Sequence, residues 1–129
     1  MATWTSDELR KIAAAEELEL ASAGAGGMSR HPVTIWVVRV ADDLFVRSWK
    51  GRASAWYRAS QARGEGHIQA GGVDKDVTFV PENDDGVNDR IDAAYRMKYQ
   101  SQGPRWVDPM VSAQARTATL KLVPRSTRE

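Results

Sequence analysis

The stretch that decides the fold is "VTIWVVRVADDLFVRSWKGRASAWYRASQARGEGHIQAGG", which runs from Val33 to Gly72. It opens with two runs of β-branched and aromatic residues, 33–40 and 44–49, separated by the short acidic segment 41–43. Two such runs joined by a short polar turn are typical of a β-hairpin. The following segment, 53–63, contains no Gly or Pro and predicts a helix. The stretch therefore predicts two antiparallel strands with a helix across their exit.

The rest of the chain adds further short strands and helices. Thr5 and Glu8 have the spacing of a capping box, so a helix should begin near Ser6. Period-two and helical patterns predict strands at 17–22, 67–70, 73–80 and 120–122, a long helix from about 87 to 100, and a short helix capped by Ser112. Strands joined by hairpins favour an antiparallel sheet, and about six of them bury their edges best by closing into a small barrel. We therefore expect a single α+β domain over residues 1–129, with a barrel core and flanking helices.

Composition excludes several classes of protein. The chain has 129 residues, of which 42% are apolar and 27% charged, as in ordinary globular domains. It has no cysteine, which excludes disulfides, thiolate nucleophiles and cysteine zinc sites. A net charge of +1 creates no overall field that would attract nucleic acid or an anionic membrane. Charged residues near the amino terminus and the lack of a long apolar segment predict a cytoplasmic protein.

A local anion site is nevertheless suggested by the segment that follows the hairpin. Between residues 47 and 63 there are five basic residues and no acidic one: Arg47, Lys50, Arg52, Arg58 and Arg63. Arg offers a donor fork suited to phosphate, Lys adds a mobile charge, and Gly51 would let the backbone approach a ligand closely. The alternative is that these are solvated side chains paired with the acidic residues of segment 82–92.

The aromatic residues also have two interpretations. Trp36, Trp49, Trp56 and Tyr57 could stack on a flat ring, yet large aromatics are also common in cores and subunit interfaces. Trp106, in "GPRWVDPM", could cover a barrel mouth or dock a second subunit. Because the hairpin is apolar on both faces, we expect a homodimer.

Recognisable catalytic motifs are missing from the sequence. There is no dinucleotide fingerprint, phosphate-binding P-loop or nucleophile elbow. The two histidines, His31 and His67, are far apart and have no cysteine partners, so no metal site is predicted. Any redox chemistry would have to come from a bound cofactor.

Two segments carry a resemblance to known proteins. "RHPVTIWVVRVADDLFVRS" followed by "KGRASAWYRA" resembles the split β-barrel, nitroreductase-like proteins that bind FMN or a deazaflavin, in which a hairpin leads to a "KGG…AWYHN"-like segment. The chain as a whole, from "WTSDELRKIAAAEELELAS" through "DRIDAAYRMKY" to "VDPMVS", is similar to a short bacterial family of unknown function, domain-of-unknown-function family 2255. The resemblance implies that the predicted barrel is a small antiparallel split β-barrel with flanking helices.

The resemblance also implies a cofactor site. By position, the cofactor-binding residues would be Ser29, Arg30, His31, Arg47, Ser48, Lys50, Gly51 and Trp56. The "GRKSG"-like signature of the cofactor-binding relatives is replaced by "GAGGMSRHP". Two hypotheses follow. The protein is a flavin- or deazaflavin-dependent oxidoreductase, with cofactor sites near a dimer interface, or it is a non-catalytic barrel that binds a small anionic ligand or a protein partner.

Overall fold

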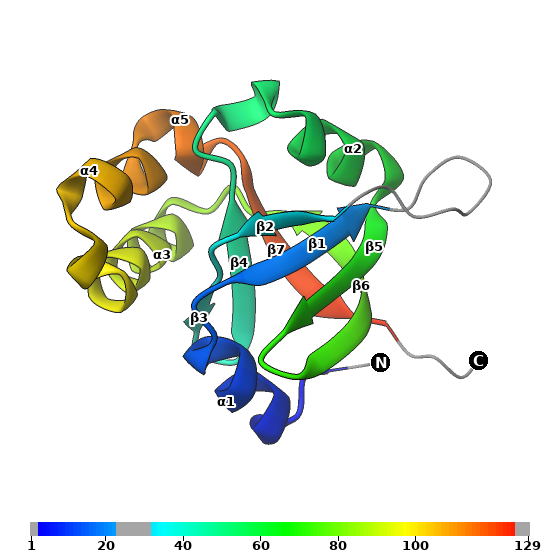
Figure 1. Cartoon of the computed structure of the whole chain (residues 1–129). Coiled ribbons are helices and arrows are strands. Elements are labelled where there is room, and N and C mark those ends of the chain that lie inside the picture. The colour runs from blue at the N-terminus through cyan, green and yellow to red at the C-terminus, as the bar shows by residue number, and fades with distance from the viewer. Residues whose placement is uncertain (1–2, 23–31, 126–129) are drawn as a thin grey trace.

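A seven-stranded antiparallel sheet forms the centre of the molecule (Figure 1). The structure is a computed structural model that describes residues 3–22 and 32–125. Its strands are β1 (Leu18–Ser22), β2 (Val33–Ile35), β3 (Val38–Val40), β4 (Asp43–Arg47), β5 (Glu65–Ala70), β6 (Val73–Pro81) and β7 (Thr119–Pro124). They are hydrogen-bonded in the order β2-β1-β5-β6-β7-β4-β3. The two edge strands, β2 and β3, follow each other directly in the chain, so the sheet must curl until its edges approach. The result is a split β-barrel, as the resemblance to split-barrel proteins implies.

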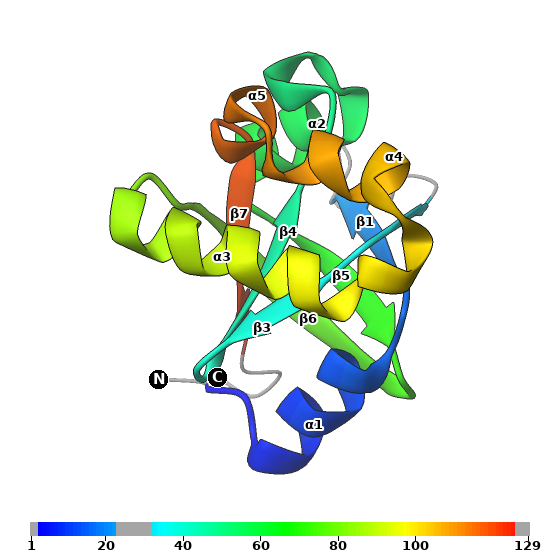
Figure 2. The same cartoon turned by 90° about the vertical axis from the view of Figure 1, so that its left-hand side faces the viewer.

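Helices cover the barrel at both ends and along one side. They are α1 (Ser6–Ala14), α2 (Ala55–Arg63), α3 (Asp85–Lys98), α4 (Pro104–Val107) and α5 (Ala113–Arg116), with short 3₁₀ turns η2 (Gly51–Ala53), η3 (Gln100–Gln102) and η4 (Asp108–Val111). In Figure 1, α1 and α2 lie at opposite ends of the barrel, and α3, α4 and α5 gather on one side. Figure 2 shows α3 in front of β3 and β4. Over the described ranges, no helix is both long enough and apolar enough to cross a membrane.

Local signals placed most of these elements correctly. The Thr5 side chain accepts from the Glu8 N–H and Glu8 bonds back, which completes the predicted capping box. Asp84 caps α3 and Ser112 caps α5. Gly64, at φ 74°, ends α2 in the left-handed conformation that glycine adopts most easily.

The run 33–40 is not the single strand that the sequence predicts. Its first part, β2, pairs with β1, whereas its last part, β3, pairs with β4. The break falls at Trp36 and Val37, where the barrel is split. There the Val37 N–H donates to the Tyr99 hydroxyl at 3.2 Å, and the Lys98 Nζ donates to the Val37 carbonyl at 2.7 Å. Side chains from the end of α3 therefore take the hydrogen bonds that a neighbouring strand would otherwise supply.

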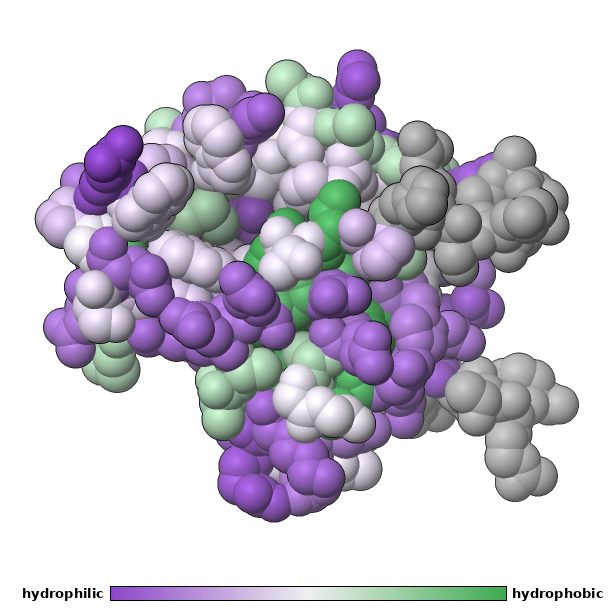
Figure 3. Space-filling view, viewed as in Figure 1, coloured by the Kyte–Doolittle hydropathy of each residue, from purple (hydrophilic) through white to green (hydrophobic). Residues whose placement is uncertain are grey.

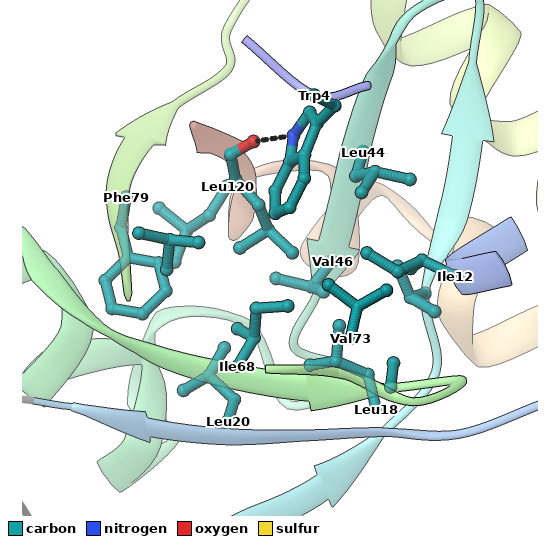
Figure 4. Close-up of a cluster of buried hydrophobic side chains, with 14 of the residues drawn as sticks. Trp4, Ile12, Leu18, Leu20, Leu44, Val46, Ile68, Val73, Phe79 and Leu120 are labelled. Carbon is teal, nitrogen blue, oxygen red and sulfur yellow. Dashed lines mark hydrogen bonds between the residues drawn. The ribbon is translucent and has the colours of Figure 1, made fainter. Parts of the chain in front are cut away.

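The main core fills the inside of the barrel (Figure 4). Alternate strand residues such as Leu44, Val46 and Leu120 point inward together, as period-two patterning requires. Trp4 closes one side of this core, and its indole N–H donates to the Leu122 carbonyl at 2.9 Å. The indole ring is thus buried, and its one polar atom still has a hydrogen-bond partner.

A second core lies between the barrel wall and α3. Val38 and Phe45, on the outer face of the hairpin, pack with Ile91 and Tyr95 of the helix and with Tyr99, which follows its last residue. The hairpin is apolar on both faces because α3 covers its outer face. Part of the apolar surface that led us to expect a dimer is therefore buried within the single chain.

Candidate functional site

A cleft of about 680 Å³ opens between the barrel and the α4–η4 segment. Its walls come from β2, the end of β4, the start of α2, α4 and η4. The lining residues are Val33, Thr34, Ile35, Trp36, Arg47, Ser48, Trp49, Lys50, Ser54, Trp56, Arg105, Trp106, Pro109 and Met110. In Figure 3, green side chains gather near the middle of the face, over β1 and β2 and below α2. The volume and the mainly apolar wall are typical of a small-molecule site.

Four tryptophans contribute to the wall, and they differ in how far they are exposed. Trp36 stacks on Tyr99 with ring centroids 3.9 Å apart and an interplanar angle of 2°. Trp56 meets Tyr57 edge to face at 6.2 Å. These two inner rings are held by neighbours and only partly exposed. Trp49 and Trp106, by contrast, are 57% and 58% exposed, so two further rings stand at the mouth of the cleft.

Arg47 lies in the cleft wall, but its side chain is not displayed at a rim as the strand pattern suggested. It is only 1% exposed, and all five of its N–H donors have acceptors. Nε donates to Thr119 Oγ1 at 2.9 Å, and Nη1 donates to the Met110 carbonyl at 2.9 Å and to Asp92 Oδ1. Nη2 donates to the carbonyl and the Oδ1 of Asn88, at 3.2 and 2.8 Å. The guanidinium has no donor left for a phosphate.

These bonds make Arg47 the centre of a polar network, here called the Arg47 network: Arg47, Asn88, Asp92, Arg116 and Thr119. Asp92 accepts from Arg116 Nη1 at 2.6 Å as well as from Arg47. The network joins β4 and β7 to α3, and its bond to Met110 adds η4. For Arg47, the pairing with the acidic segment 82–92 that we considered as an alternative is therefore correct.

The remaining cations of the cleft stand at its mouth. Lys50 Nζ lies 5.3 Å from the ring centroid of Trp49, and the Arg105 guanidinium lies 5.5 Å from that of Trp106. Among the described residues that line the cleft there is no Asp or Glu. With Arg47 neutralised by Asp92, Lys50 and Arg105 give the open end of the cleft its positive charge.

The structure brings together four of the residues that the sequence singled out: Arg47, Ser48, Lys50 and Trp56 all line the cleft. Gly51 is buried and does not line it. At φ 69°, its missing Cβ would lie 2.5 Å from Cγ of Gln114, so the close approach that glycine permits is to this side chain. Ser29, Arg30 and His31 lie outside the described residues.

For the far wall of the cleft, sequence reasoning considered the segment 103–110 as a cover for a barrel mouth or as a docking site for a second subunit. It did not single out Ser54, Arg105, Pro109 or Met110, and β2 was treated only as part of a strand. Arg105 adjoins Trp106, so the pair had the same basic and aromatic character that drew attention to Lys50 and Trp49. What the sequence lacked was the fold that brings the two pairs to one cleft.

Lys98 is a titratable group beside the split of the barrel. Burial disfavours its charged form and lowers its pKa to about 8, although the nearby carboxylate of Glu16 opposes this shift. Its ammonium lies 5.2 Å from the ring centroid of Tyr99, which in turn stacks on Trp36 of the cleft wall. The group whose charge changes with this pKa is therefore the one that hydrogen-bonds to Val37, at the break between β2 and β3.

The fold and the cleft together define a split β-barrel protein with a cleft lined by aromatic residues. Residues 8–122 match the family described as "Uncharacterized protein conserved in bacteria (DUF2255)", and the chain belongs to this family. No curated protein matches it.

Solved structures with this fold come from several bacteria. A Listeria innocua protein whose proposed activity is that of a pyridoxamine 5′-phosphate oxidase has a TM-score of 0.62 at 12% identity, over 92% of this chain and 90% of its own. The heme storage protein HutZ from Vibrio cholerae has a TM-score of 0.61 at 13% identity, over 94% of this chain and 90% of its own. A FAD-binding protein from Mesorhizobium loti has a TM-score of 0.61 at 19% identity, over 97% of this chain and 93% of its own. At such identities the likeness establishes the fold alone.

Proposed function

We propose that the chain binds a flavin-type cofactor, FMN or a deazaflavin, in the aromatic cleft and acts as an oxidoreductase. The observation that carries the proposal is the set of four tryptophans around one cleft of about 680 Å³ with no carboxylate among its described lining residues. A flavin is flat, aromatic and anionic at its phosphate end. Indole faces favour such a ring, and a wall without carboxylates avoids repelling the phosphate.

The neighbours in fold support a cofactor of this kind, since one of them binds FAD and another stores heme. The residues of the cleft favour the flavin. Its described wall contains no histidine, tyrosine or cysteine, three of the side chains that hold a heme iron, and Met110 is its one methionine. The wall does contain the large rings that a flavin would stack against.

The wall also limits which chemistry the protein itself could perform. Its titratable side chains, over the described residues, are Arg47, Lys50 and Arg105. Among these described lining residues there is no histidine, aspartate or glutamate, the side chains that most often transfer protons in catalysis. A bound flavin supplies hydride transfer by itself. The residues of the chain would orient the ring, with Trp36 and Trp56 as the fixed surfaces, and would exclude water from it.

Binding is tested by the absorption spectrum of freshly purified protein and by calorimetric titration with FMN and with a deazaflavin. Trp106→Ala should weaken either ligand about three- to tenfold, the worth of one aromatic contact. Met97→Ala is the matched control, because Met97 is 77% exposed on α3 and lies outside the cleft wall. If the parent binds neither ligand at about 1 mM, the proposal is wrong.

The alternative is a non-catalytic barrel that binds a ligand or protein partner, and the two exposed tryptophans at the mouth are what favours it. The two functions separate once a flavin is bound. In the oxidoreductase, flavin reduced anaerobically with dithionite should pass its electrons to an acceptor dye faster when bound than when free. A bound flavin that reacts more slowly than free flavin with every acceptor tried would favour the alternative.

A further inference from the structure

The two cations at the mouth of the cleft, Lys50 and Arg105, are not explained by stacking alone. Lys50 directly follows Trp49 after β4, whereas Arg105 belongs to α4, so two distant segments each bring one cation to the same cleft. Both side chains are exposed. Within the described part of the chain, neither has a carboxylate within ion-pair distance, whereas Arg47, the third cation of the cleft wall, pairs with Asp92.

The contacts that these cations do make are weak. Each lies over the ring of its neighbouring tryptophan, at 5.3 Å for Lys50 and 5.5 Å for Arg105. A cation–aromatic pair at an exposed site contributes far less than a charge-assisted hydrogen bond to a phosphate. Both groups could therefore turn to an anion at little cost, and they would do so beside two aromatic rings.

Arg47, the other cation in the wall, cannot serve this purpose because its five donors are occupied within the Arg47 network. We infer that Lys50 and Arg105 form an anion clamp at the mouth of the cleft, and that the ligand is a planar aromatic molecule carrying a phosphate group. This inference rests on the proposed function and makes it specific. The ring lies among the tryptophans, the phosphate lies at the mouth, and Arg105 of α4 determines the preference for phosphorylated ligands.

The test is calorimetric titration of the full chain with two matched ligand pairs. FMN and riboflavin differ by the phosphate, as do pyridoxamine 5′-phosphate and pyridoxamine, which have a smaller ring. Arg105→Gln and Lys50→Gln remove the charge but keep a polar side chain of moderate length. Arg90→Gln is the control, because Arg90 is exposed, loses the same charge and lies outside the cleft wall. Melting temperatures of all variants should match that of the parent, since exposed side chains rarely affect stability.

The clamp predicts that each of the two cleft variants weakens FMN about tenfold or more and riboflavin less than about threefold, while Arg90→Gln changes neither. The loss should shrink at high salt, which screens the parent's attraction for the phosphate.

Other outcomes distinguish a failure of the anion clamp from a failure of the proposed function. If the parent binds FMN and both cleft variants bind it equally well, or if the parent binds FMN and riboflavin alike, the clamp is wrong and flavin binding stands. If the parent binds no flavin, the proposed function is wrong and the pyridoxamine pair decides. Tighter binding of the phosphorylated form that is lost in both variants would still support the clamp, and any other result with this pair would overturn it.

Discussion

Truncation of Arg47 to alanine should destabilise the protein severely. The side chain is 1% exposed and donates five hydrogen bonds, one of them to the carboxylate of Asp92. Removing one partner of a buried ion pair typically costs 3–5 kcal/mol, because the other charge and its neighbours lose their partners. Asp92 keeps its bond to Arg116 Nη1 at 2.6 Å, which places the expected loss near the lower limit, about 3 kcal/mol.

A loss of this size is easy to measure in a domain of this length. It corresponds to a fall of about 10–15 °C in melting temperature, followed by circular dichroism, and to a lower urea midpoint. Lys50→Ala is the matched control because Lys50 is a nearby cation that is exposed, and its loss should change stability by less than about 0.5 kcal/mol. A second variant, Arg47→Lys, should recover only part of the loss, since an ammonium has three donors in place of five.

The reasoning would be refuted if Arg47→Ala melted within about 2 °C of the parent. Arg47 would then be an exposed residue of the cleft, as the strand pattern alone suggested, and its role as a phosphate ligand would have to be reconsidered. A severe loss that Arg47→Lys fully repaired would show that charge matters and that the full set of five bonds does not.

Three further predictions concern the split of the barrel, the turn after β4 and assembly. The folded pKa of Lys98, about 8, lies below its ordinary 10.5, so the charged side chain opposes folding below pH 8 and the stability of the parent should rise between pH 8 and 10.5. In urea titrations across this window, Lys98→Met should lack that part of the rise. Equal slopes of stability against pH in the parent and the variant would contradict the prediction. Gly51→Ala should lose about 1–2 kcal/mol from its positive φ and more from the contact with Gln114, so its urea midpoint should fall below that of Gly64→Ala, which has a positive φ but open space. We expect a homodimer at micromolar concentration, and light scattering that gave a mass near 14.3 kDa would overturn this.

Elements marked by local chemistry could be predicted from the sequence. A capping box, an Asp or Ser cap and a left-handed glycine each act within a few residues, so Thr5, Asp84, Ser112 and Gly64 mark helix ends in the sequence as they do in the structure. The same is true of the hairpin between β3 and β4, which is marked by a short acidic turn between two β-branched runs.

The break between β2 and β3 could not be predicted in this way. The run 33–40 is uniformly β-branched and aromatic, so nothing local distinguishes Trp36 and Val37 from the residues around them. The break exists because Tyr99 and Lys98, more than 60 residues away, supply hydrogen bonds to Val37 at 3.2 and 2.7 Å. Hydrogen bonds from residues so far away in the chain do not change the sequence pattern of the strand, so the pattern cannot predict the break.

The expectation that Arg47 is displayed at a rim is wrong, and part of the information needed to avoid the error was present in the sequence. In β4, Leu44 and Val46 point into the barrel, so period-two alternation puts Phe45 and Arg47 together on the outer face. That face was taken to be either a solvated rim or a dimer surface. An apolar residue as large as Phe45 on it already implied a cover, and α3 carries Asp92 next to the buried Ile91. A cation that shares a face with a buried aromatic residue needs an acidic partner on the covering element, and its distance from the predicted ligand is a poor guide to its role. By the same reasoning, the cations to test for ligand binding are the two described residues of the cleft wall that the fold leaves without a carboxylate, Lys50 and Arg105.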